Sequence, residues 1–318
     1  MRVLITGAGG FVGHALIATP SPLQWRAAIR ALPEPQRGSD HVIVGDISER
    51  TEWSSALAGM DCVVHLAARV HVMHPTAQDR IEFERVNVLG TERLAQQAAA
   101  NGVKRFVYLS SIKVNGERTT ARPFRADDVP QPHDDYARSK LEAERRLAAL
   151  QATCEMAVSI VRPPLVYGPG VRANFLRLLS LANSGLPLPL ASIANTRSMV
   201  SVWNLCDVIC ALLLHERPMK GVFVVADGED ISTVELVRRL AAIMHRPARL
   251  FPMPLPALQA LAAIAGRSGE LGRLCDSLAV DISETRRRLN WSPSLTLDEG
   301  LRRTAQWYLR EHTNPAAA

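Results

Sequence analysis

A glycine-rich turn stands between the first apolar run of the chain and its first helical pattern. Val3-Leu4-Ile5-Thr6 is typical of a buried strand, and Gly7-Ala8-Gly9-Gly10-Phe11-Val12-Gly13 follows it directly. Gly7 allows a tight turn, Gly10 lets a pyrophosphate approach the backbone, and Gly13 lets the helix pack closely on the strand. Glycines also make plain turns, but this position between strand and helix favours dinucleotide binding, with the helix N-terminus facing the anion.

Short apolar runs alternate with helical patterns through the first two-thirds of the chain. Strands that are apolar almost throughout, separated by helices, predict a parallel sheet covered on both faces. We therefore expect an α/β fold, a doubly wound (Rossmann) sheet whose ligands bind at the carboxyl ends of the strands. The expected strands are 2–6, 25–30, 42–44, 62–66, 105–110, 158–162 and 223–225, and the expected helices there are 11–18, 51–57, 82–101 and 135–150.

After Arg162 the chain becomes rich in proline and glycine, and then mainly helical, with helices expected near 171–184, 232–245 and 297–312. The apolar run 255–265 is expected to be a packed helix, with a membrane-facing patch as the alternative. This change in composition and pattern predicts two domains. A dinucleotide-binding domain covers 1–166, with 197–226 returning to it, and a smaller, partly interleaved α+β substrate domain covers 167–196 and 227–318.

Composition excludes several classes of protein. With 47% hydrophobic and 21% charged residues the chain is neither disordered nor collagenous. No apolar run reaches the ~18–20 residues of a transmembrane helix. Five scattered cysteines predict free thiols and a cytoplasmic protein. The net charge of +6 comes from dispersed arginines with few aromatics, so no nucleic-acid partner is expected.

No metal site is expected either. Cys206 and Cys210 share a helix face without a second pair of ligands, so we interpret them as buried small hydrophobes. His71 and His74 follow the fourth expected strand, but no carboxylate-rich set accompanies them. They are expected to shape the loop over the nicotinamide.

Two residues bear on the choice of dinucleotide. Arg30 ends the second expected strand. An acidic residue at this position would bond the 2′-hydroxyl of NAD, whereas Arg30 could pair with the 2′-phosphate of NADP. The alternative is an exposed arginine without a role. Asp46, which follows the third strand, could accept from the adenine amino group or could cap a helix or turn.

A second group of residues predicts proton-transfer chemistry. Tyr136 and Lys140 stand four apart, so both point to one face of a helix that Asp134 is expected to cap. A nearby ammonium lowers a phenol pKa and makes the phenolate available near neutral pH. Ser111 follows strand 105–110, where its hydroxyl could bond the reacting oxygen. A Tyr-x-x-x-Lys pair also occurs by chance, but this serine and the glycine turn favour the functional interpretation.

Together these motifs resemble the extended short-chain dehydrogenases/reductases of the NAD-dependent epimerase/dehydratase group, which act on nucleotide sugars. The resemblance covers essentially the whole chain. Its carriers are Gly7-x-x-Gly10-x-x-Gly13, Gly45-Asp46, Val64-His65-Leu66-Ala67-Ala68, Asn87-Val88-x-Gly90-Thr91, Leu109-Ser110-Ser111, Tyr136-x-x-x-Lys140 and Arg162-Pro163-Pro164-x-Val166-Tyr167-Gly168-Pro169-Gly170.

The resemblance implies Ser111, Tyr136 and Lys140 as the catalytic residues, with Lys140 also holding the nicotinamide ribose. On the substrate side it implies Ser111, Asn174 and Arg197, the last holding a pyrophosphate, although a surface ion pair is the alternative for Arg197. It also implies a homodimer through the helices near 87–101 and 135–150. The expected cofactor is NAD(P), with a preference for NADP(H), bound by Gly7, Gly10, Phe11, Val12, Gly13, Arg30, Asp46, Ile47, Leu66, Ala67, Ala68, Asn87, Tyr136 and Lys140.

One departure narrows the chemistry. The family's 4,6-dehydratases carry an Asp-Glu pair soon after the catalytic hydroxyl residue, whereas this chain has no acid between Ser111 and Glu117. That leaves reduction or epimerisation at sugar C4. Segments 111–117 and 162–170 most resemble bacterial enzymes that reduce UDP-2-acetamido-2,6-dideoxy-4-hexulose to UDP-N-acetylquinovosamine for surface polysaccharide, and we expect this reaction.

Two alternatives stay open. One is a UDP-glucose or UDP-N-acetylglucosamine 4-epimerase, since many chains of this pattern carry that label. The other is a non-catalytic NADP-sensing regulator on the same fold, against which the intact Ser111, Tyr136 and Lys140 argue.

Overall fold

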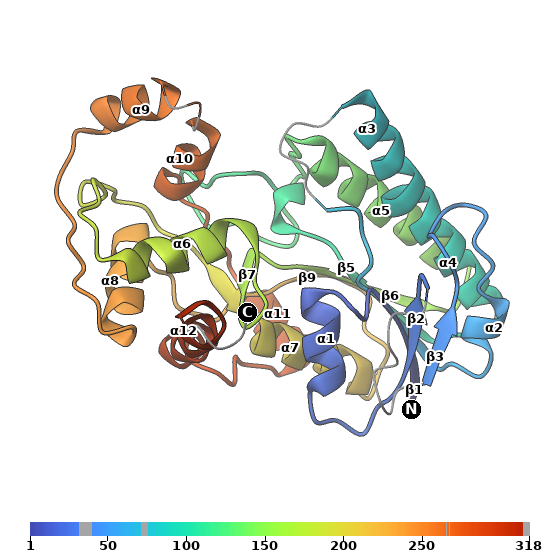
Figure 1. Ribbon diagram of the computed structural model, residues 1–318. Helices are drawn as coiled ribbons and strands as arrows, with labels where there is room; N and C mark the ends of the chain where they lie inside the picture. Colours follow the sequence, from blue (N-terminus) through green and yellow to red (C-terminus); the bar gives the residue numbers. More distant parts are fainter. Residues whose placement is uncertain (32–39, 71–75, 265, 267, 314–318) are drawn as a thin grey trace.

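A parallel sheet forms the centre of the computed structural model, which describes residues 1–31, 40–70, 76–264, 266 and 268–313 (Figure 1). Its strand order within these residues is β3-β2-β1-β4-β5-β6-β9, and every neighbouring pair is parallel. This topology confirms the predicted doubly wound α/β fold. The strands are β1 Arg2–Thr6, β2 Gln24–Ile29, β3 Asp40–Ile43, β4 Cys62–His65, β5 Arg105–Leu109, β6 Ala157–Arg162 and β9 Gly221–Val224.

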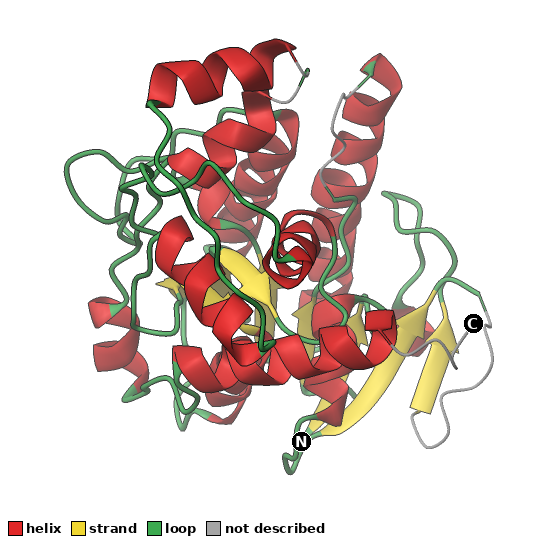
Figure 2. Ribbon diagram, turned by 60° about the vertical axis from the view of Figure 1, so that its left-hand side comes forward, coloured by secondary structure: helices red, strands yellow, loops and turns green. Residues whose placement is uncertain are grey.

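Helices lie on both faces of the sheet (Figure 2). The α-helices are α1 Phe11–Ala18, α2 Ser54–Leu57, α3 Ala77–Phe83, α4 Gly90–Ala100, α5 Asp135–Gln151, α6 Ala173–Ser184, α7 Val202–Leu214, α8 Thr233–Ile243, α9 Leu255–Ile264, α10 Ser268–Cys275, α11 Ser283–Leu289 and α12 Leu297–Thr313. The helix expected over 82–101 is present, but it begins earlier, at Ala77, and contains a π-helical segment, η1 (Glu84–Leu89), between α3 and α4. Over six residues, apolar spacing cannot distinguish π from α turns.

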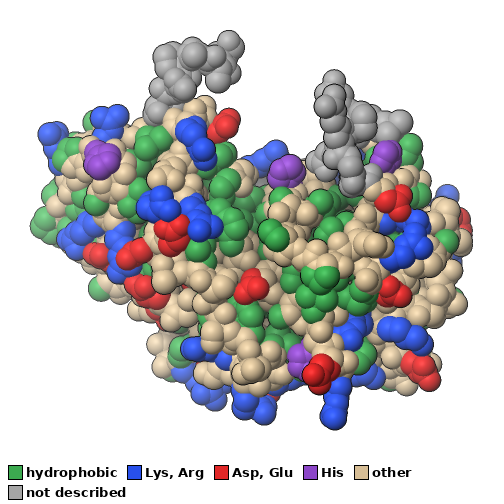
Figure 3. Space-filling model, turned by 90° about the horizontal axis from the view of Figure 1, so that it is seen from below, with side chains coloured by type: hydrophobic (Ala, Val, Ile, Leu, Met, Phe, Trp, Pro, Cys, Tyr) green, Lys and Arg blue, Asp and Glu red, His purple; other side chains and the backbone are tan. Residues whose placement is uncertain are grey.

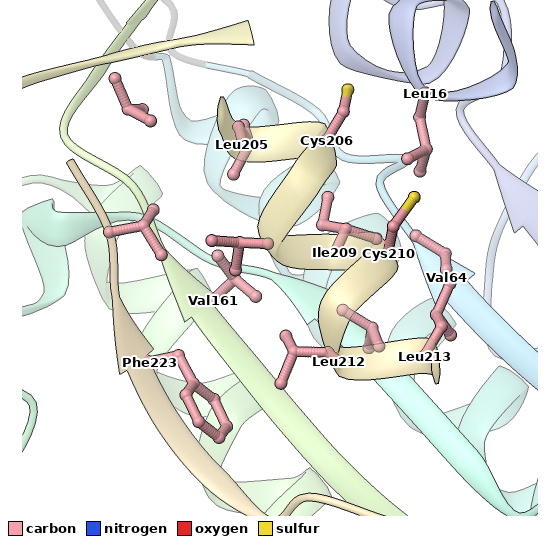
Figure 4. Close-up of a cluster of buried hydrophobic side chains, with 14 of the residues drawn as sticks. Leu16, Val64, Val161, Leu205, Cys206, Ile209, Cys210, Leu212, Leu213 and Phe223 are labelled. Atoms are coloured by element: carbon pink, nitrogen blue, oxygen red, sulfur yellow. The ribbon is translucent and has the colours of Figure 1, made fainter. Parts of the chain in front are cut away.

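Alternate side chains of each strand supply the cores on the two faces. Val3 and Ile5 of β1 join the cluster formed with α1 and α7, whereas Leu4 joins the cluster formed with α2, α4 and α5. Figure 4 shows Cys206 and Cys210 of α7 in the first cluster. Both thiols are buried, and burial raises the pKa of Cys210 to about 11. The prediction that they act as small core hydrophobes is confirmed.

A third core lies beyond the carboxyl side of the sheet and joins α6, α8 and α12. It includes a two-stranded sheet, β7 Leu165–Tyr167 and β8 Met199–Ser201, that the sequence analysis did not expect. Three residues are too few for an alternating pattern to be visible in a sequence. The division of the chain into two domains stays a prediction.

Helix α9 differs from its expectation. We expected a packed helix, yet Leu258 is the one described residue of α9 that is buried, and Ile264 is 86% exposed. The main neighbour of α9 is α10, and apolar composition alone does not bury the rest of the helix. No helix among the described residues is both long and apolar enough to span a membrane.

Charges of both signs are mixed over the surface. Figure 3 shows Lys and Arg side chains lying among Asp and Glu on one face. Exposed pairs within single helices, such as Arg302–Glu299 in α12 at 2.7 Å, account for part of this mixing. Such pairs contribute little stability because water screens them.

We predict that Gly13→Ala destabilises the protein and that Gly9→Ala does not. A Cβ on Gly13 would lie 2.8 Å from the Ala8 Cα, in contact with backbone that cannot move aside, whereas a Cβ on Gly9 meets no atom within 4 Å. Overpacking of this kind costs about 1–3 kcal/mol. Urea unfolding of both variants checks this. Equal stability of the two variants would contradict the close packing of α1 on the turn.

Candidate functional site

The glycine turn lies at the carboxyl end of β1, against the loop that follows β4. The Gly10 N–H donates to the Gly7 carbonyl at 2.9 Å, and Gly7 has φ +72°. A Cβ on Gly7 would lie 2.8 Å from the Ala67 nitrogen, so the two loops touch. The first N–H groups of α1, those of Phe11 and Val12, have no partner within the helix. These residues fit a dinucleotide, because the missing side chains leave the backbone open beside a helix N-terminus.

Arg30 and Asp46 lie at the ends of β2 and β3, where they pair with each other. Arg30 Nε is 2.9 Å from Asp46 Oδ1, and the two side chains are 82% and 66% exposed. At the place expected for the adenosine end of a dinucleotide, the Arg30 guanidinium is therefore already paired with the Asp46 carboxylate. Ile47 packs under the same edge, with its Cγ2 2.6 Å from the Cβ position of Gly90.

A buried polar chain supports the loop after β4. The Thr91 hydroxyl donates to the Asn87 carbonyl, so it accepts from His65 Nε2 at 2.9 Å, and His65 Nδ1 then accepts from the Thr6 hydroxyl at 2.7 Å. Burial lowers the pKa of His65 to about 3, which keeps the ring neutral. The Asn87 amide bonds the Arg69 backbone and the Ser139 hydroxyl. Asn87 therefore holds the loop with Ala67 and Ala68 against α5.

The structure brings Ser111 and Tyr136 to one cavity. Ser111 follows β5 and caps the 3-10 turn η2 (Ile112–Val114), its Oγ accepting from the Lys113 N–H at 3.3 Å. Tyr136 is partly exposed in the first turn of α5, with its ring edge-on to Phe83 at 6.3 Å. The acceptor role of the serine leaves its own O–H free to donate to a ligand.

Lys140 lies behind Tyr136 and is 2% exposed. Its Nζ donates to the Leu109 carbonyl at 2.8 Å and lies 5.9 Å from the centroid of the Tyr136 ring. The lysine therefore connects α5 to the end of β5, one turn below the phenol that it was expected to tune.

The free protein does not lower the pKa of Tyr136, and that expectation is wrong. Burial, aided by the charge of Asp134, raises the phenol pKa. Burial also lowers the pKa of Lys140 to about 7, against the opposing effect of Glu144. Desolvation by burial is the largest cause of both shifts.

A buried ion pair fixes these elements to one another. Glu144 of α5 and Arg162 at the end of β6 are 4% exposed and pair through both carboxylate oxygens. The Ser110 hydroxyl donates to the same carboxylate, and Arg162 donates to the Asn115 amide oxygen at 3.0 Å. Residues on both sides of Ser111 are thus held to the helix that carries Tyr136.

One cavity of about 650 Å³ joins the catalytic candidates to the substrate candidates. Ser111 and Tyr136 line it together with Asn174, the second residue of α6, and Arg197. Arg197 Nη1 donates to the carbonyls of Arg273 and Asp276, so these bonds, and not the alternative of a surface ion pair, hold it. All four predicted residues therefore share one space, although they are far apart in sequence.

Sequence reasoning missed three charged residues of this cavity: Lys113, Arg177 and Arg273. Arg177 stands three residues after Asn174 on the same helix face, a spacing that could have identified it. Lys113 and Arg273 reach the cavity only through tertiary packing. Among the described residues no group of three or more His, Cys, Asp or Glu is placed to hold a metal ion. His71 and His74 lie outside the described residues.

Comparison with known proteins identifies the family. The model of the NAD dependent epimerase/dehydratase family matches residues 3–226. A UDP-glucose 4-epimerase of Vibrio cholerae is 42% identical over 313 residues, which cover 97% of this chain and 95% of that protein.

Two solved structures resemble the whole chain. UDP-glucuronic acid 4-epimerase from Bacillus cereus, in complex with NAD, has a TM-score of 0.79 at 22% identity and covers 100% of this chain and 99% of its own. MoeE5 in complex with UDP-glucose and NAD has a TM-score of 0.77 at 27% identity, with 98% and 99% covered. The first shows the fold alone. From the family match and the Vibrio relative, the chain belongs to the NAD-dependent epimerase/dehydratase family and is an enzyme of that family.

Proposed function

We propose that this enzyme is a UDP-hexose 4-epimerase, which oxidises C4 of the sugar and reduces it again from the other face. The observation that carries the proposal is that one cavity is lined both by Ser111 and Tyr136 and by three arginines. The 42% identity to a UDP-glucose 4-epimerase supports the same reaction. The reaction also needs a bound dinucleotide, and the glycine turn after β1 fits one.

Tyr136 is the proton-transfer group and Ser111 the positioning group. Tyr136 takes the proton of the C4 hydroxyl and gives it back, while the Ser111 O–H donates to the same oxygen and orients it. The change of oxidation state at C4 is the chemistry that a bound nicotinamide supplies. Lys140 holds the nicotinamide ribose, and its Leu109 bond fixes the direction of its ammonium.

The arginines of the cavity suit the diphosphate of the substrate. Arg177, Arg197 and Arg273 come from three separate segments, and a planar guanidinium can donate two bonds to one phosphate. Asn174 adds an amide donor on the same face of α6 as Arg177. Apolar side chains of the same lining, including Leu178 and Leu278, suit packing against a nucleoside base.

Net reduction of a UDP-4-keto-6-deoxy-N-acetylhexosamine, our first expectation, has less support. It rests on the resemblance of segments 111–117 and 162–170 to UDP-N-acetylquinovosamine-forming enzymes and on Arg30 as a binder of NADP. The Vibrio relative instead bears the name of an epimerase, and the solved relatives above hold NAD. The homodimer through α4 and α5 stays a prediction.

We predict that Tyr136→Phe removes most turnover and leaves NAD binding nearly unchanged. The variant loses the proton-transfer group alone, which typically contributes ~10²–10⁴-fold to the rate. Turnover and NAD binding are measured on the same preparation. Turnover near that of the unaltered enzyme, with normal binding, would exclude the assigned chemistry.

The C4 reaction itself is tested with two mixtures. One holds UDP-glucose or UDP-N-acetylglucosamine with NAD and no added reductant, and we expect inversion at C4. The other holds UDP-4-keto-6-deoxy-N-acetylhexosamine with NADPH, and we expect little stoichiometric oxidation. The opposite pattern would replace the epimerase by the reductase.

We predict that Arg30→Ala weakens NADP⁺ binding and leaves NAD⁺ binding nearly unchanged. Arg30 is the cation at the end of β2, and its Asp46 partner opposes a 2′-phosphate but not a 2′-hydroxyl. Asp46→Asn is the matched variant, and it should strengthen NADP⁺ binding by freeing Arg30. Equal losses for both dinucleotides in Arg30→Ala would contradict this role.

A further inference from the structure

A lysine lies on the cavity wall beside the two catalytic candidates. Lys113 lines the same cavity as Ser111 and Tyr136 and is the second residue of η2. Its Nζ is 2.6 Å from Asp134 Oδ2 and 3.6 Å from Glu117 Oε1, and its side chain is 28% exposed. The pair with Asp134 is partly withdrawn from water, so it is screened less than a surface pair.

This ion pair bridges the two elements that present Ser111 and Tyr136. The two oxygens of the Asp134 carboxylate accept different hydrogen bonds. Oδ1 accepts from the Ala137 N–H at 2.7 Å and so caps α5, whereas Oδ2 accepts from Lys113 Nζ. At the other end, the Lys113 backbone N–H donates to the Ser111 hydroxyl oxygen. One short chain of contacts therefore runs from the serine through Lys113 and Asp134 to the first turn of α5.

The charges around Tyr136 come from several elements. Lys140 lies below the ring on α5, and the Tyr108 phenol belongs to β5. On the outer side, Asp135 pairs with Arg138 of α5 and with Arg80 of α3 at 2.9 Å. Glu144 is bound by Arg162. Asp134 raises the pKa of the Tyr136 phenol, and its carboxylate is the one that Lys113 partners.

We propose that Lys113 is a positioning residue that acts on Tyr136 through Asp134. Its ammonium offsets the negative charge that the helix cap places beside the phenol, and its tether holds the start of α5 against the Ser111 turn. This inference rests on the proposed function, because it gives Tyr136 the role of a proton-transfer group.

The sign of the effect differs between the two partners. Lys113→Met removes the lysine cation from the Asp134 carboxylate, so the phenolate is disfavoured and Tyr136 ionises at higher pH. Asp134→Asn keeps an N-cap, since asparagine caps as well as aspartate, but removes the negative charge, so Tyr136 ionises at lower pH. Each shift should be about one unit, the low end of the effect of one charge within ~4–6 Å. The double variant should return close to the unaltered enzyme.

The first measurement reads Tyr136 directly and needs no substrate. The chain has four tyrosines, so ¹³C-tyrosine NMR of the NAD-bound protein gives few signals, and Tyr136→Phe assigns the relevant one. At pH 9.5 the ionised fraction should rank Asp134→Asn above the unaltered enzyme and Lys113→Met below it. Lys113→Arg should restore the unaltered value. Equal fractions in all folded variants, zero included, would overturn the proposal.

The second measurement is the pH dependence of kcat/KM with UDP-glucose. The acid limb of the profile should move to higher pH in Lys113→Met and to lower pH in Asp134→Asn. Glu117→Gln is the control and should leave the limb nearly unchanged, because the Glu117 carboxylate lies 3.6 Å from Lys113 Nζ and is 49% exposed. Coinciding limbs, with Tyr136→Phe inactive, overturn this inference and leave the proposed function standing. Full activity of Tyr136→Phe overturns the proposed function, whatever the NMR ranking shows.

Discussion

The buried pair of Glu144 and Arg162 is the interaction on which the geometry of the site depends. Two charges withdrawn from water are tolerated because they pair with each other and are hydrogen-bonded further, Glu144 by the Ser110 hydroxyl and Arg162 by the Asn115 amide oxygen. The pair ties α5 to the ends of β5 and β6. Tyr136 and Ser111 are carried by these elements, so their separation is set by a contact that touches neither of them.

Desolvation shifts the pKa of three titratable groups at this site. The same burial that packs Lys140 and His65 under the sheet edge lowers the pKa of each, and burial raises the pKa of Tyr136. A proton-transfer group with a raised pKa must be activated by charges near it. The proposed cations are Lys140 and, through Asp134, Lys113. On the proposed function, the activation of Tyr136 depends on charges that the folded chain brings together, and the Tyr-x-x-x-Lys spacing supplies only one of them.

Local patterns allowed much of the fold to be predicted. Apolar runs of strand length, a glycine turn and a Tyr-x-x-x-Lys helix depend on neighbours within a few residues, and each of the seven sheet strands lies where the pattern placed it. Short or irregular elements escaped prediction. The pair β7 and β8 is too short for a period, η1 differs from an α-helix only in its hydrogen bonds, and α9 is apolar yet exposed.

The sequence by itself determined which residue types could do the chemistry, because the turn after β1 and the spacing of Tyr136 and Lys140 are local. Only the tertiary structure decided which charges these residues meet. Arg177, Arg197 and Arg273 reach one cavity from three segments, and Lys113 meets Asp134 across 21 residues of chain. The physical reason is that electrostatic effects depend on distance through space and on exclusion of water, and spacing along a chain reports neither.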